Sequence, residues 1–188
     1  MVTPQNTIRL VLSGSGGQGV ITAAIIIAEA AALYSGKNAT QTQSYGAAAR
    51  GGATRSDVII SDHEIHYPGV IQPNILVTLT QNACNSFATI IRPGGLLLSD
   101  PKFVDIQIRT EAKSLRLPMY EMVMDEIGKP IVYNICMLGT LVGITQLVEP
   151  DAVLKVLERR IPKDFLEMNF KAYNMGVTLG EQHQYRTF

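Results

Sequence analysis

The sequence predicts one α/β domain: a mostly parallel sheet flanked by helices, Rossmann-like in arrangement, with a helix-rich final third. Two observations support this fold class. Short apolar runs alternate with longer helical patterns as far as Leu117, and four helical patterns then follow one another. Alternation of strands and helices is typical of a parallel sheet covered on both faces. A length of 188 residues suits one domain, so residues 1–188 are interpreted as a single unit.

Six short segments are the expected strands. Most are apolar runs bounded by glycine, proline or small polar residues, as buried strands are. The segment that begins at Asn38 is instead polar and rich in threonine and glutamine, and it is β-prone. The expected strands are Ile8–Leu12, Asn38–Gln43, Asp57–Ser61, Ile75–Leu79, Leu96–Ser99 and Ser114–Leu117.

Six longer segments are the expected helices. The first is rich in alanine and isoleucine and stops at Ser35-Gly36. The second is closed by a Pro-Gly-Gly turn that returns the chain to the sheet. The expected helices are Val20–Tyr34, Gln81–Ile91, Tyr120–Ile127, Ile131–Leu147, Asp151–Arg159 and Asp164–Gly180.

Composition argues against several classes of function. Sixteen basic residues balance sixteen acidic ones, so the chain lacks the positive charge typical of nucleic-acid binders. Cys84 and Cys136 are isolated, which excludes a four-cysteine iron–sulfur site within this chain. Charged residues make up only 17% of the sequence, which fits either a subunit covered by partners or an ordinary compact monomer.

No part of the sequence predicts a membrane segment. The polar start, Met1 to Thr7, lacks the pattern of a signal peptide. The most apolar stretch, Val20 to Leu33, is interrupted by Glu29 and is too short to cross a bilayer. We therefore expect a soluble cytoplasmic protein.

A glycine-rich loop between the first strand and the first helix is the first candidate site. Its G-x-G-x-x-G spacing places backbone N–H groups at a helix N-terminus, where partial positive charge favours a phosphate or another anion. The alternative is a tight turn that binds nothing. The loop consists of Gly14, Ser15, Gly16, Gly17, Gln18 and Gly19.

The surroundings of this loop argue against ordinary NAD binding. A dinucleotide site needs an acidic residue about 20 positions further on to bind the ribose hydroxyls. Here that region is Ala39-Thr-Gln-Thr-Gln43, which has no carboxylate. No Gly-Lys-Ser/Thr follows the glycines, so the loop is not a P-loop either.

A second loop is expected between the second and third strands. Small residues there permit close packing, and Arg50 and Arg55 can clamp a carboxylate or a phosphate. The alternative is a purely structural loop in which Arg50 pairs with Asp57 or caps a helix. The candidate interface residues are Ser44, Tyr45, Gly46, Arg50, Gly51, Gly52 and Arg55.

Other reactive residues are interpreted as structural or solvated. His63 and His66 flank Glu64, but their spacing does not indicate a shared metal ion, so no metal site is expected. Cys84 has no base nearby in a known motif and is expected to be buried and inert. The sequence contains no recognisable nucleophile–base pair, which argues against an independent enzyme.

Taken together, the two loops resemble those of a known family. A strand followed by Gly-Ser-Gly-Gly-Gln-Gly-Val, and then Gln-Ser-Tyr-Gly-x-x-x-Arg-Gly-Gly, is similar to the gamma subunit of 2-oxoacid:ferredoxin oxidoreductases. The similarity continues at Arg92-Pro-Gly-Gly-Leu-Leu, at Asn134-Ile-Cys-Met-Leu-Gly139 and at Asn169-Phe-Lys-Ala-Tyr-Asn-Met-Gly176. It extends over nearly the whole chain.

The resemblance implies a role within a larger enzyme. Such complexes decarboxylate a 2-oxoacid on thiamine diphosphate, pass two electrons through iron–sulfur clusters to ferredoxin or flavodoxin, and release an acyl-CoA. Alpha and beta subunits hold thiamine diphosphate with its Mg²⁺, and a delta subunit carries clusters. The gamma chain holds neither and is inactive alone. Its Gly14–Gly19 loop would face coenzyme A, and its Ser44–Arg55 loop would contact the alpha or beta subunit.

Two questions stay open at this point. The resemblance favours a 2-oxoglutarate enzyme that makes succinyl-CoA, with pyruvate and 2-oxoisovalerate enzymes as the alternatives. In a different class, the chain would be a stand-alone nucleotide-binding module. The missing carboxylate near residue 40 argues against that module.

Overall fold

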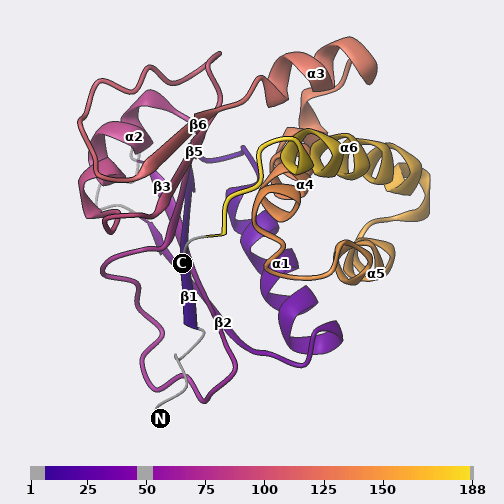
Figure 1. The fold of residues 1–188 in the computed structure, drawn as a ribbon. Helices are drawn as coiled ribbons and strands as arrows, with labels where there is room; N and C mark the ends of the chain where they lie inside the picture. The colour runs from indigo at the N-terminus through magenta and orange to yellow at the C-terminus, as the bar shows by residue number, and fades with distance from the viewer. Residues whose placement is uncertain (1–6, 46–52, 187–188) are drawn as a thin grey trace.

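A computed structural model describes residues 7–45 and 53–186 and shows a sheet with unequal helical layers on its two faces. Helices α1, α4, α5 and α6 lie to the right of the sheet in Figure 1, and the shorter α2 lies to its left. The α/β fold class is therefore confirmed. That residues 1–188 form one domain remains a prediction.

The sheet has six strands in the order β2-β3-β1-β4-β5-β6. Strands β1, β4, β5 and β6 pair in parallel, whereas β3 runs antiparallel to both of its neighbours. The sheet is thus mostly parallel, as predicted, with β3 as the exception. The strands are β1 (Thr7–Gly14), β2 (Asn38–Tyr45), β3 (Thr54–Ser61), β4 (Ile75–Thr78), β5 (Leu96–Ser99) and β6 (Lys113–Arg116).

The helices follow the predicted order with small differences at their ends. The predicted helix over residues 81–91 ends early and continues as a 3₁₀ turn, and the predicted helix over 131–147 begins with another. The elements are α1 (Val20–Tyr34), α2 (Gln81–Phe87), η1 (Ala88–Ile90), α3 (Met119–Glu126), η2 (Pro130–Val132), α4 (Tyr133–Thr145), α5 (Pro150–Arg160) and α6 (Lys163–Glu181).

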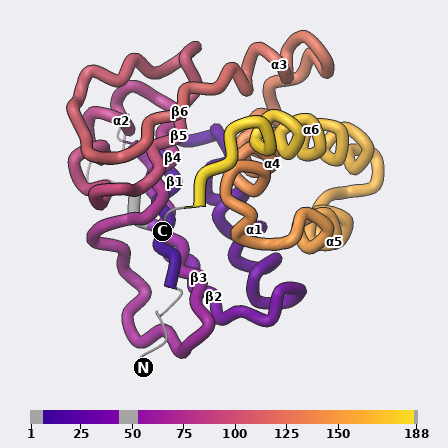
Figure 2. The backbone as a smooth tube through the Cα atoms, in the orientation of Figure 1, coloured from indigo at the N-terminus to yellow at the C-terminus, as the bar shows by residue number. Residues whose placement is uncertain are grey.

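Alternate residues of the central strands build two cores. Leu10, Leu12 and Val77 face the large helical layer, while Val11 and Leu76 face α2 and the loops beside it. Period-two alternation of this kind is expected where both faces of a strand are buried. Figure 2 shows how the chain path places α1 between the sheet and the later helices.

Helices α4 and α6 pack backbone against backbone through four glycines. A Cβ on Gly139 or Gly143 would collide with a backbone carbonyl of α6, and a Cβ on Gly176 or Gly180 would collide with one of α4. All thirteen residues of α4 are buried, which places this helix at the centre of the helical layer. Two helices can approach this closely only where both carry glycine at the points of contact.

We predict that Gly143→Ala destabilises the fold by about 1–3 kcal/mol, because the methyl group forces the two helices apart. The same substitution at an exposed helical glycine would instead stabilise the fold, because alanine is the better helix former by about 1 kcal/mol. Chemical denaturation measures the change. Asn174→Ala, at an exposed position of α6, is the matched control and should be nearly neutral. Equal stability of Gly143→Ala and wild type would contradict the packing.

An ion pair attaches α5 to α1. The Arg160 guanidinium donates to both carboxylate oxygens of Glu29, with Nε–Oε2 at 2.7 Å, and this hydrogen bond lowers the pKa of Glu29. Glu29 is the only charged residue of α1. A lowered folded-state pKa means that the stabilisation is present above the unfolded-state pKa and is lost as pH falls through the folded-state value.

We therefore predict that Glu29→Gln lowers the free energy of unfolding by about 0.5 kcal/mol at pH 7, since the pair is partly exposed. In strong acid, where Glu29 is protonated, the difference should vanish. Denaturation at a series of pH values tests both points. A difference that persists in strong acid would show that the ion pair is not its source.

Candidate functional site

The two predicted motifs meet at one end of the sheet. Gly14, at the end of β1, lies opposite Thr54, at the start of β3, and Ser13 lies opposite Arg55. The Ser13 hydroxyl donates to the carbonyl of Thr54 (2.9 Å). This is the carboxyl end of the parallel strands, where ligands bind in open α/β sheets. Segments some 40 residues apart in sequence are therefore neighbours in space.

The glycine loop is held in shape by one of its own side chains. Gln18 accepts a hydrogen bond from the Ser15 N–H (2.7 Å) through Oε1, and its Nε2 donates to the carbonyl of Leu79 (3.4 Å). A Cβ on Gly14 would collide with this side chain at 2.5 Å. The glutamine thus fills the space beneath the turn and attaches it to the end of β4.

Several backbone donors of the loop remain free. Within the described residues no acceptor faces the N–H groups of Gly16, Gly17 or Val20. Helix α1 begins without a side-chain cap and without an acidic residue in its first turn. Free N–H groups together with the helix dipole favour an anion here. Anion binding by this loop stays a prediction.

Gly19 joins the loop to helix α4. Its φ of 70° lies in the left-handed region, where glycine is unstrained. Asn134, near the start of α4, donates from Nδ2 to the Gly19 carbonyl (3.2 Å), and its side chain occupies the space a Cβ would need. The loop therefore rests on α4, the helix fixed by the four-glycine contact.

Beside the loop lies a groove of about 300 Å³. That volume is at the lower end of the range typical of small-molecule sites. Its walls come from the loop, α1, η2, α4 and α6, and they are mostly apolar, with no charged side chain. The lining residues are Gly17, Gly19, Thr22, Ile131, Val132, Asn134, Ile135, Ile161, Pro162, Phe165, Met168 and Asn169.

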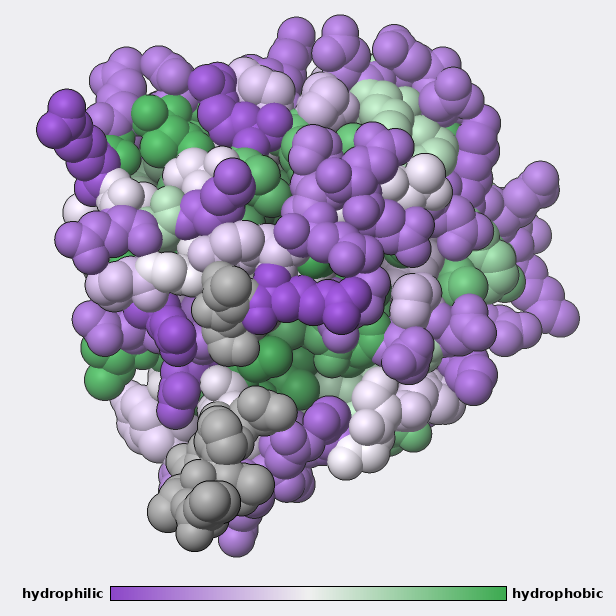
Figure 3. Space-filling model, in the orientation of Figure 1, coloured by the Kyte–Doolittle hydropathy of each residue, from purple (hydrophilic) through white to green (hydrophobic). Residues whose placement is uncertain are grey.

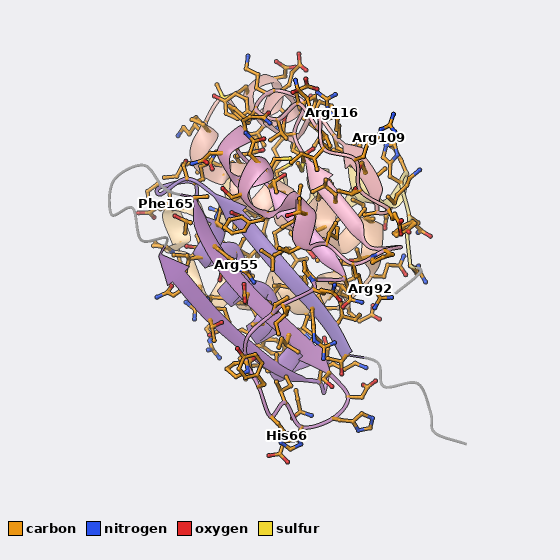
Figure 4. All side chains as sticks on the ribbon, turned by 90° about the vertical axis from the view of Figure 1, so that its left-hand side faces the viewer. Arg55, His66, Arg92, Arg109, Arg116 and Phe165 are labelled. Carbon is orange, nitrogen blue, oxygen red and sulfur yellow. The ribbon has the colours of Figure 1, made fainter. Side chains whose placement is uncertain are left out.

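Arg55 lies away from this groove. It forms a two-point ion pair with Asp57 (2.6 and 3.0 Å), donates to the Val70 carbonyl and lies over the ring of Phe87. These contacts place it on the α2 side of the sheet. Figure 4 shows that side, with Arg55 in front and Phe165 at the margin behind the sheet. Within the described residues, Arg55 thus fastens the loop over 62–74 to β3.

The rest of the second motif is only partly described. Ser44 and Tyr45 end β2, so the backbone there is strand rather than loop, and Tyr45 pairs with Thr54. Gly46, Arg50, Gly51 and Gly52 lie outside the described residues. Among the described residues, Asp57 accepts hydrogen bonds from Arg55 and from the Val70 N–H (2.9 Å), and a pairing with Arg50 stays a prediction.

The remaining reactive residues are two buried cysteines and two exposed histidines. Both cysteines are buried, as expected for Cys84, and burial raises the pKa of Cys84 and raises that of Cys136 to about 12. Thiols with raised pKa values react poorly. His63 and His66 are exposed in a loop, and no cluster of three metal-ligating residues occurs among the residues described. No described helix is long and apolar enough to cross a membrane.

A second hollow lies at the other end of β1. It measures about 570 Å³, is lined by Ile8, Ile60, Leu147 and their neighbours, and opens on the face in Figure 3, where apolar residues line its floor. It lies at the amino end of the parallel strands, with Glu149 at the start of α5 in its wall, whereas ligands bind at the carboxyl end in open α/β sheets. We therefore take the loop and its groove as the candidate site.

Sequence reasoning missed the groove itself. Ile131, Phe165 and the two asparagines were not selected, because each belongs to a helix far along the chain from the glycine loop. The available signal was that Asn134 and Asn169 are the first residues of the two C-terminal motifs that resemble the family. Nothing in the sequence indicated that these motifs would meet the loop.

Comparison with known proteins places this site in a family. The chain matches the pyruvate ferredoxin/flavodoxin oxidoreductase family over residues 9–179. It is 42% identical over 173 residues to the 2-oxoglutarate synthase subunit KorC of Methanocaldococcus jannaschii, a match that covers 91% of this chain and 92% of that protein.

Two solved structures share the fold. The gamma subunit of a keto/oxoacid ferredoxin oxidoreductase from Geobacter sulfurreducens superposes with a TM-score of 0.84 at 38% identity, covering 93% of this chain and 99% of that one. The 2-oxoglutarate:ferredoxin oxidoreductase from Magnetococcus marinus, solved with coenzyme A bound, gives 0.85 at 20% identity, covering 97% of this chain and 32% of that longer chain. At that identity the likeness concerns the fold alone. The chain belongs to the pyruvate ferredoxin/flavodoxin oxidoreductase family, as its two motifs predicted.

Proposed function

We propose that this chain is the gamma subunit of a 2-oxoglutarate:ferredoxin oxidoreductase. The complex would convert 2-oxoglutarate, coenzyme A and two oxidised ferredoxins into succinyl-CoA, CO₂, two reduced ferredoxins and a proton. The observation that carries the choice of substrate is the 42% identity to a 2-oxoglutarate synthase subunit over nearly the full length of both chains. Pyruvate and 2-oxoisovalerate enzymes are the alternatives that an assay must exclude.

In this proposal the cofactors of electron transfer belong to partner chains. Thiamine diphosphate and Mg²⁺ would lie in the alpha and beta subunits, and the clusters in a delta subunit. Two points support placing the clusters and Mg²⁺ there: both cysteines of this chain are buried, and no group of three metal-ligating side chains occurs among its described residues. The complex would work in the cytoplasm and deliver electrons to ferredoxin or flavodoxin.

The contribution of this chain would be to help bind coenzyme A. The free N–H groups of Gly16, Gly17 and Val20 would hold a phosphate of the ligand at the start of α1. Gln18 and Asn134 would keep those donors oriented before the ligand arrives. Preorganised donors bind more tightly because little ordering is left to be done on binding.

The activity is tested by purifying the tagged chain from its native source. We predict that larger partner subunits elute with it, and that the eluate reduces ferredoxin with 2-oxoglutarate only when coenzyme A is added. Pyruvate and 2-oxoisovalerate serve as competing substrates in the same assay. Preference for either of them would change the substrate assignment, and an eluate without partners would overturn the role as a subunit.

The loop is tested by placing a negative charge in it. A Cβ on Gly16 meets no atom within 4 Å, so Gly16→Asp should fold normally. Charge repulsion of about 1–2 kcal/mol should then raise the KM for coenzyme A about tenfold in the assembled complex. Gly16→Asn, which has the same shape without the charge, is the control. Equal KM values for the two variants would argue against a phosphate at this loop.

A further inference from the structure

We propose that this chain pairs with a second copy of itself along strand β2, so that two sheets join into one and helix α1 of each copy packs against α1 of the other. The inference goes beyond the proposed function and does not rest on it. It assigns a self-association surface to the chain and implies that the assembled complex contains the chain in pairs.

The first observation is that the two edges of the sheet are protected differently. At one edge, β6 has only four residues, and two of them are Lys113 and Arg116. Short length and basic side chains commonly keep an edge strand from pairing with another chain. At the other edge, β2 has eight residues, Asn38–Tyr45, with neither a charged residue nor a proline. The β2 edge therefore lacks the protection that β6 has.

The backbone of β2 is regular, and its outer side is open. All eight residues pair with β3, from Asn38 opposite Ser61 to Tyr45 opposite Thr54, without a bulge. In an antiparallel pair, about half of the N–H and C=O groups of an edge strand point away from its neighbour. Within residues 7–45 and 53–186, the backbone of β2 hydrogen-bonds to no backbone group outside β3. The outer side thus presents a row of donors and acceptors that fits an extended strand.

The second observation is an uncovered apolar stripe on α1. Ile21, Ile25, Ala28 and Ala32 are spaced four, three and four residues apart, as on one face of a helix. Among the described residues, Ile21 and Ile25 are half-buried and pack against neither hydrophobic core, and Ala32 is exposed. A helix that is apolar on all its sides, with Glu29 as its single charge, is typical of a helix buried on all its sides. The stripe therefore indicates a further neighbour.

The stripe and the open strand lie on the same side of the molecule. Helix α1 packs over β2 and β3, next to the edge of the sheet. Helix α4 adjoins both α1 and α3, the helix that follows β6, so α4 covers α1 from the side of the inner strands. On the side of α5, Arg160 binds Glu29. In the part of the chain that the structure describes, α1 is left uncovered toward the β2 edge.

One two-fold axis at this edge would satisfy both features. Antiparallel pairing of β2 with β2 of a second copy would join the two six-stranded sheets and bring both α1 helices to the same face. Neighbouring strands lie about 4.8 Å apart, and α1 packs on β2 and β3 alike, about one strand spacing from such an axis. The two helices would then be about 10 Å apart, which is the distance between packed helices.

The composition of β2 favours a second copy of the chain as the occupant. This axis pairs residues of the same sheet face, so Gln41 of one copy would meet Gln41 or Gln43 of the other, and threonine would meet threonine. Amide and hydroxyl side chains form favourable cross-strand pairs, and no like charges oppose each other. A strand from a different subunit would need an apolar helix of its own beside it to cover α1 as well.

The test uses the full chain, alone and in the assembled complex. Light scattering during gel filtration measures the mass of the free chain over a range of concentrations, and native mass spectrometry counts its copies in the complex. Two double variants, Gln41→Lys/Gln43→Lys and Gln41→Glu/Gln43→Glu, place charges where the strands meet. Ile25→Lys places a charge on the stripe of α1. Leu33→Lys, at an exposed apolar position on another side of α1, is the matched control.

We expect the wild-type chain and Leu33→Lys to dimerise. Each double variant and Ile25→Lys should raise the Kd of the dimer by about tenfold or more, while chemical denaturation shows that each variant is folded. A mixture of the lysine and glutamate double variants should form a dimer with one copy of each, because opposite charges then face each other across the axis. Pairing of β2 with itself predicts this rescue.

Three results would overturn the inference. The first is a wild-type chain that stays monomeric at every concentration, or a complex that holds a single copy of it. The second is a dimer that both double variants and Ile25→Lys retain unchanged, because the contact would then lie elsewhere on the surface. The third is a mixture of the two double variants that does not dimerise.

Discussion

The direct backbone contact between α4 and α6 is the constraint on which the candidate site depends. Four glycines, two on each helix, let the helices approach so closely that neither tolerates a Cβ at the crossing. The contact lies in the second half of α4 and in the last turns of α6, and it sets the two helices side by side. Residues nearer their starts reach the site: Asn134 contacts Gly19, and Phe165 and Asn169 line the groove. A looser crossing would widen the groove and withdraw the support beneath the loop.

The candidate site has two parts, the glycine loop and the apolar groove beside it. Gln18 and Asn134 hold the glycine loop, and no acceptor among the described residues pairs with the N–H groups of Gly16, Gly17 or Val20. The groove beside it offers apolar walls with two amide acceptors. Among the described residues, neither part holds a group of three metal-ligating side chains.

Local signals in the sequence predicted the elements and the glycine loop well, because strand and helix periodicity and the Gly14–Gly19 spacing depend on near neighbours. The antiparallel direction of β3 was not predicted, since strand direction depends on which strands pair. Arg55 was interpreted as a possible anion clamp, but its carboxylate partner, Asp57, lies two residues away on the same strand. Predicting the groove would have required the relative positions of α1, α4 and α6, and local sequence patterns do not give these positions.

The account is tested most directly by backbone hydrogen exchange of the assembled complex, with and without coenzyme A. Exchange reports on individual amides, so it addresses the free N–H groups of the loop themselves. We predict that coenzyme A slows exchange over residues 16–22 and at the starts of α4 and α6, while the β3 segment around Arg55 is unchanged. Slowed exchange elsewhere in this chain, with residues 16–22 unaffected, would contradict the proposed site.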